Sequence, residues 1–367
     1  MMAPFHGMSL RWRHMKTLHF ILLVLSTTIS PAAVLLDDDW DDGDRTDTNF
    51  PEESAWFGSS VLTTNPTLSA SIGSLTGNVL MFETNTSSRL WITHFTPAGT
   101  PAELGLGETL KITLAFTASG VTTNPATTRG LRIGLFNFSE TGASRVSADG
   151  FSTGAGGGAP GANVTGYMIN MNFAQTNTIN SPLQIMKRTD LPNINLMGAT
   201  AAYSSLSSGG GILGAPAFSN DVPYTMELSV KRLDTSVEIT VRFFDTNGWG
   251  ITNQVADASN PNLRFDGFAM RPNSVGDSAQ SFTFTRFKAE TVPFALRFTS
   301  IKFDTPETLT LTWDSIPNQA YQVEWRDDLL ESSPWNFLGT VIATGQSTSM
   351  QDPAATWIQR FYRVIQF

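Results

Sequence analysis

The sequence predicts an all-β protein built from two β-sandwich domains, and three observations lead to this fold class. Apolar and polar residues alternate with a period of two in several segments. Thr, Ser, Asn and Gly are abundant, whereas Lys and Glu, the usual surface residues of helices, are scarce. No long stretch has apolar residues at a helical spacing of 3.6. Many short strands separated by turn residues are typical of a β-sandwich.

The segment before the first strand predicts export. Residues 1–32 contain three basic residues and no acid, then an apolar run from Leu18 to Leu25, then small residues up to Ala32. This is the pattern of a signal peptide, and the apolar run is shorter than the roughly 20 residues that span a bilayer. We therefore predict cleavage after Ala32 and a secreted, cell-surface or periplasmic protein. An uncleaved anchor is the alternative, and translation could also start at Met15.

Composition excludes several kinds of chemistry. The chain has no cysteine, and three of its four histidines precede residue 33, which leaves His94 alone in the exported chain. Thiol nucleophiles, iron–sulfur clusters and zinc sites with two histidines are thereby excluded. Without residues 1–32, 20 basic and 32 acidic residues remain, so the net charge changes from −9 to −12. Nucleic acid is not a predicted partner, and no membrane span is predicted in the exported chain.

The first strand is predicted within the aspartate-rich stretch LLDDDWDDGDRTD, which begins at Leu35. An EF-hand loop starting at Asp38 would need ligands at its third and twelfth positions, where Trp40 and Asn49 stand. We therefore reject an EF-hand. We predict instead a strand over 33–40 with Trp40 pointing inward, followed by a turn at residues 42–43.

The next strands are predicted from alternation. Residues 111–119 place Ile112, Leu114 and Phe116 on one face. The segments 226–233 and 237–245 alternate on either side of a turn, and 281–290 alternates more loosely. The Gly/Ser-rich segments 152–163 and 204–216 predict long flexible loops, and residues 100–105 predict one short turn of helix.

The C-terminal segment predicts a second, smaller sandwich. A boundary is expected within 289–298, since four tryptophans lie in the last 55 residues. Strands are predicted over 308–315, 320–328, 335–343 and 360–367. A small sandwich without disulfides needs large apolar side chains, so we expect Trp313, Trp325 and Trp335 in its core.

The order of these segments resembles two known families. From Val34 to Glu290, the Asp-rich opening strand, Trp56, LGLGETLKITLAFTASG, YTMELSVKRLDTSVEITVRFFD, LRFDGFAMR and FTFTRFKAE follow one another. This order resembles the concanavalin A-like lectin/glucanase superfamily, a jelly roll of two antiparallel sheets. The segment LTWDSIPNQAYQVEWRDDL and the later RFYRV resemble the immunoglobulin/fibronectin-like C-terminal modules of secreted bacterial proteins. We expect the jelly roll over 33–292 and the smaller module over 293–367.

The resemblance implies binding rather than catalysis. Enzymes of the superfamily carry Glu-x-Asp-x-x-Glu on one strand, which this sequence lacks. We therefore predict no catalytic residue and a non-catalytic protein that binds extracellular carbohydrate, a polysaccharide or glycan. Two alternatives stay open: a structural or adhesive surface protein, and a glycoside hydrolase with a carboxylate pair of another spacing.

Two tryptophans are the predicted ligand-binding residues. Trp249 stands between two glycines at the tip of a predicted turn, where an exposed indole would offer a flat face to a sugar ring. Trp56 is a weaker candidate of the same kind. The alternative is that Trp249 folds back onto the edge of a sheet. His94 is expected to be structural, since no Gly-x-Ser-x-Gly motif accompanies it.

A structural Ca²⁺ is the only predicted cofactor, as an alternative to none. In a jelly roll the first and last strands commonly lie side by side, which would bring Asp39 and Asp41 toward the last strand. Carboxylates of Asp39, Asp41 and Glu290 would together need a cation. If Lys288 faces the aspartates instead, the charge is already balanced, and we favour this arrangement.

Overall fold

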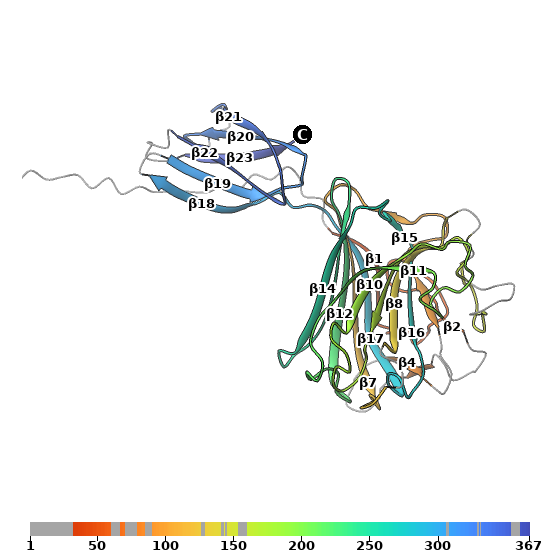
Figure 1. Cartoon of the computed structure of the whole chain (residues 1–367). Helices are drawn as coiled ribbons and strands as arrows, with labels where there is room; N and C mark the ends of the chain where they lie inside the picture. The colour runs from red at the N-terminus through yellow and green to blue at the C-terminus, as the bar shows by residue number, and fades with distance from the viewer. Residues whose placement is uncertain are drawn as a thin grey trace, which may run out of the picture. The chain divides into compact units, whose positions relative to one another are not determined.

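The computed structural model describes two compact units, of which one ends at Phe294 and the other begins at Ala295 (Figure 1). Residues 1–31 of the predicted signal peptide lie outside the described residues. The described residues are 32–59, 67–69, 79–84, 90–125, 129–140, 143, 145–152, 160–305, 308–328, 330, 332–353 and 360–367.

The larger unit confirms the predicted all-β, two-sheet jelly-roll fold. Every regular element described is a strand, and no helix long and apolar enough to cross a membrane occurs among these residues. We call the eight-stranded antiparallel sheet the back sheet and the seven-stranded antiparallel sheet the front sheet. Their strands are visible as two layers in Figure 1.

The back sheet has the order β14-β13-β12-β7-β17-β4-β3, with β1 also paired to β17. Its strands are β1 (Ala33–Asp38), β3 (Thr67–Ser69), β4 (Val79–Glu83), β7 (Thr109–Ser119), β12 (Pro223–Arg232), β13 (Val237–Asp245), β14 (Gly250–Asp257) and β17 (Ser281–Val292). The front sheet has the order β11-β10-β9-β8-β16-β5-β2. Its strands are β2 (Trp56–Gly58), β5 (Trp91–His94), β8 (Leu131–Asn137), β9 (Thr165–Met171), β10 (Leu183–Arg188), β11 (Tyr203–Gly209) and β16 (Gly267–Pro272).

The back sheet forms where the sequence alternates. In β7 every second residue is buried, and the buried set includes Ile112, Leu114 and Phe116, as predicted. β12 and β13 pair across a tight turn closed by the Leu233 amide, which donates to the Ser236 carbonyl at 2.8 Å. The alternating polar residues leave the outer face of this sheet in contact with water.

An aromatic core fills the space between the sheets. Trp56 and Trp91 are completely buried, and Trp56 packs edge-on against Phe287 with ring centroids 5.2 Å apart. Trp40 is 1% exposed and contacts Trp56, which confirms that it points inward. Burial of such large apolar side chains is the main stabilising contribution to the fold.

Part of the front sheet is buried on both faces. Its outer face carries Ile92, Phe136, Met168 and Met186, which belong to a second hydrophobic cluster. Loop residues on either side of the strands cover them, among them Val146, Leu196 and Met197. In β9 every residue after the first is buried, so this strand shows no alternation. We call this second cluster the outer layer.

The first and last strands of the larger unit lie side by side, as predicted. β1 pairs antiparallel with β17, with Asp37 opposite Lys288 and Val34 opposite Glu290. The carboxylate of Asp37 accepts two hydrogen bonds from Arg286, at 2.6 and 2.7 Å.

Two local predictions were wrong. Part of the Gly/Ser-rich segment 204–216 forms the edge strand β11, because its backbone pairs with that of β10. The segment 100–105 is not helical: β6 (Ala102–Glu103) pairs with β15 (Arg264–Phe265). Most of the other Gly-rich segment, residues 153–159, lies outside the described residues.

The smaller unit consists of two three-stranded antiparallel sheets that share one core. Trp313 is completely buried there, whereas Trp325 and Trp335 are half-buried, so only the first of the three is a central core residue. Trp335 lies between Arg326 and Arg363, each 4.4 Å from its ring centroid, which explains its partial exposure. The strands are β18 (Phe298–Thr305), β19 (Thr308–Asp314), β20 (Ala320–Arg326), β21 (Asn336–Ile342), β22 (Ser347–Asp352) and β23 (Phe361–Gln366).

Candidate functional site

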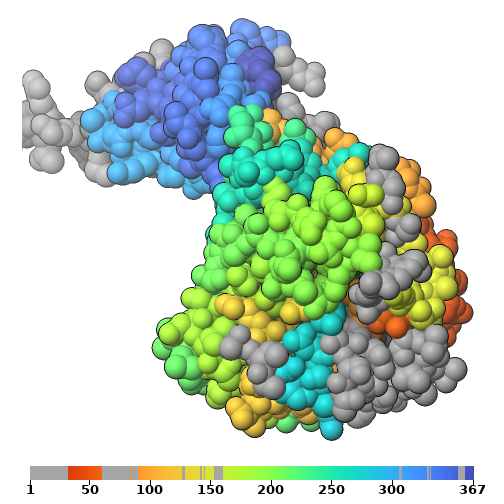
Figure 2. All heavy atoms as spheres, turned by 45° about the vertical axis from the view of Figure 1, so that its right-hand side comes forward, coloured from red at the N-terminus to blue at the C-terminus, as the bar shows by residue number. Residues whose placement is uncertain are grey.

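The larger unit has a cleft of about 420 Å³. It lies between β10 and β11 of the front sheet and the segment that follows β14 of the back sheet. Figure 2 shows these green and teal segments side by side on one face. The cleft is lined by Thr165, Lys187, Arg188, Thr189, Leu191, Ser204, Leu206, Asp257, Ser259, Asn260 and Asn262.

An ion pair lines this cleft. The Lys187 ammonium lies 2.8 Å from the carboxylate of Asp257, the last residue of β14, which is 2% exposed. The Tyr167 hydroxyl donates to the same carboxylate at 2.7 Å. Burial, followed by the nearby Asp257 carboxylate, raises the pKa of Tyr167, so the phenol stays protonated and keeps donating.

The charge of this ion pair is balanced within the protein. Lys187 also donates to the carbonyl of Asn260 at 2.6 Å, and the Ser259 amide donates to Asp257 at 3.0 Å. A carboxylate bound by an ammonium, a phenol and an amide is poorly suited to act as a base or nucleophile. The pair therefore serves to hold the end of β10 against the end of β14.

Arg188 also lines the cleft, but it is 2% exposed, and its guanidinium donates to the backbone carbonyls of Asn195, Leu196 and Gly161. The other lining groups are neutral hydrogen-bonding groups with a small apolar part. Hydroxyl groups come from Thr165, Thr189, Ser204 and Ser259, and amide groups from the two asparagines that follow β14. Such groups donate to and accept from hydroxyls equally well. The cleft can thus bind an uncharged polyhydroxylated molecule through these hydroxyl and amide groups.

The structure places Trp249 at the edge of the back sheet, where it packs inward. Its indole N–H donates to the carbonyl of Pro216 at 3.0 Å. Its ring lies 4.9 Å from the ring of Phe218 and 5.5 Å from that of Tyr224, both edge-on. Trp249 is half-buried and its indole is already engaged, so it does not present the free face that the sequence predicted.

The prediction that Trp56 contacts a ligand is wrong. Trp56 is completely buried between the sheets, because it is an inward-facing residue of β2. A side chain in this position offers no surface to a sugar.

The three predicted cation ligands are not brought together. Asp39 and Asp41 are exposed beyond the end of β1, whereas Glu290 lies opposite Val34 near the start of that strand. Glu290 forms an ion pair with Lys288 at 2.6 Å. The charge on this part of β17 is therefore balanced within the strand, whereas the sequence predicted that Lys288 would balance the aspartates.

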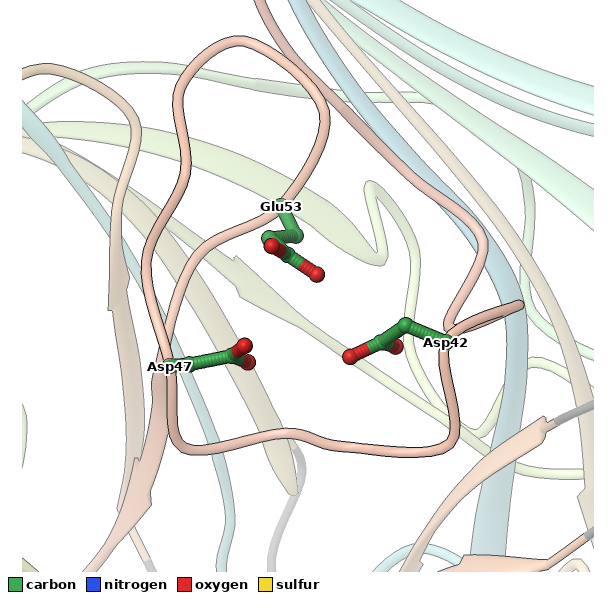
Figure 3. Close-up of side chains that lie close together, drawn as sticks. All are labelled: Asp42, Asp47 and Glu53. Carbon is green, nitrogen blue, oxygen red and sulfur yellow. The ribbon is translucent and has the colours of Figure 1, made fainter.

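A different acidic group gathers in the loop after β1. Asp42, Asp47 and Glu53 have carboxylate oxygens within 4.8 Å of one another, and their side chains point toward one another from a single loop (Figure 3). Burial, followed by the charges of Asp47 and Asp42, raises the pKa of Glu53. Three carboxylate oxygens at this spacing could ligate a hard cation such as Ca²⁺.

His94 is a buried structural residue, as predicted. It is 4% exposed and packs edge-on against Phe138, with ring centroids 5.0 Å apart. Burial, followed by the charge of Arg145, lowers the pKa of His94 to about 3. The ring is therefore neutral at physiological pH and is enclosed in the outer layer rather than in a cleft.

Sequence reasoning missed the cleft residues. Lys187 and Asp257 lie on different sheets, and neither belongs to a motif. The one sequence signal near them was the polar run DASNPN at residues 257–262, whose Asn and Ser residues mark a loop but not a ligand site.

Comparison with known proteins gives distant likenesses in structure only. No family model matches the chain, and no curated protein matches it. The carbohydrate recognition domain of Emp47p is 10% identical, with a TM-score of 0.39, over 74% of this chain and 100% of that one. Lectin II from Ulex europaeus is 9% identical, with a TM-score of 0.36, over 68% and 97%. The exoplasmic/lumenal domain of VIP36, with Ca²⁺ and Man3GlcNAc bound, is 13% identical, with a TM-score of 0.36, over 67% and 87%. Likenesses this distant do not identify a ligand.

Proposed function

We propose that this protein is an exported, non-catalytic carbohydrate-binding protein and that the cleft at Lys187 and Asp257 receives a neutral sugar. The observation that supports this most directly is the chemistry of the cleft. Lys187 and Asp257 balance each other, the Arg188 guanidinium is buried and donates to backbone carbonyls, and the other polar side chains of the cleft are hydroxyls and amides. Sugars are recognised by such groups because each ring hydroxyl both donates and accepts.

A glycan array followed by calorimetry on the positive glycans tests this proposal on the full exported chain. Thr189→Trp should abolish binding, because the indole would fill the cleft beside this exposed threonine. Thr252→Trp is the matched control, since Thr252 is an exposed threonine of β14 outside the cleft lining. Equal binding by the two variants, or no glycan bound by the wild type, would refute the assignment.

Two alternatives are separated by the same protein preparation. A glycoside hydrolase would release reducing sugar from the bound glycan, and we expect none. A purely structural or adhesive protein would bind no glycan on the array and would instead associate with cell-wall material after Thr189→Trp as well as before.

Export is the second part of the proposal. Residues 1–32 are proposed to be removed, so N-terminal sequencing of the extracellular or periplasmic protein should start at Ala33. An intact Met1 or Met15 in that fraction would contradict this.

A structural Ca²⁺ remains a prediction. The carboxylates to test are those of Asp42, Asp47 and Glu53, in place of the three predicted from the sequence. Thermal melts with millimolar Ca²⁺ and with chelator would decide it. A stabilisation that disappears in Asp47→Asn but not in Asp39→Asn would point to the loop of Asp42, Asp47 and Glu53.

We further propose that residues 295–367 form an independent immunoglobulin/fibronectin-like module. The smaller unit has its own hydrophobic cluster, including Trp313, Tyr321 and Tyr362. Arg360 and Asp352 form a buried ion pair within it. A fragment of residues 295–367 should therefore unfold in one cooperative transition, and a broad, featureless melt would argue against an independent module.

A further inference from the structure

Two arginines face each other on the outer surface of the front sheet. β8 and β16 pair antiparallel, with Arg132 directly opposite Arg271. Their strand neighbours Leu131, Ile133 and Met270 belong to the inner core, so both arginines point outward. Directly opposed side chains on one face have Cβ atoms about 4.5–5.5 Å apart.

The charges of the two arginines are not balanced by a carboxylate among the described residues. Arg132 Nη1 donates to the carbonyl oxygens of Met197 and Gly198, at 2.8 and 3.0 Å. Arg271 Nη1 donates to the side-chain oxygen of Asn273 at 3.0 Å. All of these partners are neutral. This is unusual in a chain with a net charge of −9, where acids are available to pair with arginines.

Placing two like charges side by side in a partly buried position is unfavourable. Burial, followed by the charge of Arg132, lowers the pKa of Arg271 to about 10. Burial lowers the pKa of Arg132 as well. Both guanidiniums nevertheless stay charged at neutral pH. An anion between them would remove the repulsion, and guanidinium groups bind carboxylate or sulfate oxygens with strong, charge-assisted hydrogen bonds.

Neutral polar side chains continue the same row across the sheet. Asn170 of β9 lies opposite Arg132, and Gln184 of β10 lies opposite Asn170. Gln184 donates in turn to the hydroxyl of Ser205 on β11, at 2.9 Å. The row crosses five neighbouring strands, which at about 4.8 Å per strand spacing gives a length of about 19 Å.

Buried polar atoms in this row lack partners. Asn170 is 5% exposed, and its Oδ1 accepts no hydrogen bond from the described residues. The Nε of Arg132, the residue opposite, is also buried and donates none. Unsatisfied buried groups cost free energy, and a bound ligand or ligand-ordered water would satisfy them.

We propose that this row binds an acidic polysaccharide, with a carboxylate or sulfate group between Arg132 and Arg271 and sugar hydroxyls along Asn170, Gln184 and Ser205. The anion site depends on the arginine pair alone, whereas the polysaccharide as ligand rests on the proposed carbohydrate-binding function. This row differs from the cleft, where the ion pair is already complete and a neutral sugar is expected.

The test measures binding of the full exported chain to three polymers at low ionic strength: polygalacturonate, dextran sulfate and uncharged dextran. We expect binding to at least one charged polymer, weakened by added salt. Arg271→Gln should weaken it about tenfold or more, as expected for loss of a charge-assisted contact. Arg242→Gln is the matched control, because Arg242 is an exposed arginine of the back sheet that stacks on Phe244. It should bind within about twofold of the wild type.

The proposal would be overturned if neither charged polymer bound, or if Arg271→Gln bound the polymer as well as the wild type does. An equal loss of polymer binding in Arg242→Gln would also overturn it, because binding would then depend on overall charge alone. Gln184→Ala provides a variant that keeps both arginines. It should weaken polymer binding severalfold while inorganic sulfate still raises the melting temperature, whereas unchanged polymer binding would contradict the proposed row.

The two proposals fail separately. If Arg271→Gln loses the charged polymer while Thr189→Trp keeps it, the arginine site stands whatever the cleft binds. If neutral glycans bind in the cleft and neither charged polymer binds, the arginine proposal falls and the proposed function stands. If sulfate ions bind but no polymer does, the polysaccharide part is overturned.

Discussion

The two sheets of the larger unit differ in what covers their outer faces. The back sheet is apolar inside and polar outside, and its strands alternate strictly, as in β7 and β12. The front sheet carries a second hydrophobic layer on its outer face, and strands such as β5 and β9 are buried almost throughout. This difference shows that one sheet of a sandwich can act as a central layer, which leaves less of its surface open to ligands.

The largest expected effect is on the pH dependence of the free energy of unfolding. It comes from two buried titratable groups, Asp38 of the back sheet and His94 of the front sheet. Asp38 belongs to β1 and is 2% exposed, and burial raises its pKa to about 7 despite hydrogen bonds from the amides of Trp40 and Ser54. His94 in the outer layer has its pKa lowered to about 3. The two groups therefore give stability changes of opposite sign with pH.

The signs follow from linkage. Asp38 has a raised folded pKa, so its contribution is full below about pH 4 and is lost as pH rises through about 7. His94 has a lowered folded pKa, so its contribution is full above about pH 6.5 and is lost as pH falls. Each interval of about three pH units corresponds to on the order of 4 kcal/mol. Urea unfolding between pH 4 and 6.5 should show stability rising with pH in Asp38→Asn and falling with pH in His94→Gln. The same slope in both variants would contradict the two burial assignments.

The next effect tests whether the outer layer is packed as tightly as the inner core. Met168→Ala removes a buried side chain from the outer layer, and Met226→Ala removes one from the inner face of the back sheet. Both should lower the free energy of unfolding by about 3 kcal/mol, within the usual range for such cavities. Denaturant titration measures both. A cost below about 1 kcal/mol for Met168→Ala alone would mean that the outer layer is a loose cover.

A smaller effect is expected at the edge of the back sheet. Trp249→Ala should lower the free energy of unfolding by about 2 kcal/mol, because it removes contacts with Phe218 and Tyr224 and the hydrogen bond to Pro216. Glycan binding in the cleft should be unchanged. Lost binding with an unchanged melting temperature would restore Trp249 as a ligand-binding residue.

The smallest effect is expected on the solvated face of the back sheet. Lys111 and Glu227 form an ion pair at 2.8 Å, with each side chain about one-third exposed. Lys111→Gln should cost less than about 1 kcal/mol, and the cost should shrink at high salt, because exposed pairs are screened. Melting temperatures at low and high salt measure this, with Glu227→Gln as the reciprocal control. A cost that does not respond to salt would indicate that this face is covered after all.

The contrast between the two sheets also explains which strands the sequence predicted. β7, β12, β13 and β17 were predicted because one face of each contacts water. The inward position of Trp40 was predicted from strand alternation and is confirmed, although β1 ends at Asp38 and Trp40 follows it with a φ of 58°. The strands β8, β9 and β10 escaped notice because both of their faces are buried, which removes the alternation. The predicted loop 204–216 contains β11 because pairing with β10 overrides a weak local preference.

Less of the site could be predicted. An exposed tryptophan was expected at 249, but its local sequence gave no sign of Phe218 and Tyr224, with which it packs. The aspartate run pointed to charge clustering, yet the loop brings together Asp42, Asp47 and Glu53 rather than the residues chosen from the strand. Neither Lys187 with Asp257 nor Arg132 with Arg271 carries a motif that would single it out.

The sequence by itself determined the all-β fold class, the solvated strands of the back sheet, and the absence of cysteine chemistry. These properties are local, because composition and period-two alternation report the environment of each strand on its own. Only the tertiary structure decided that loops cover part of the outer face of the front sheet, that β10, β11 and the segment after β14 line a polar cleft, and that two arginines stand opposed. Those features depend on strand register and on contacts between residues far apart in the chain, which no local pattern encodes.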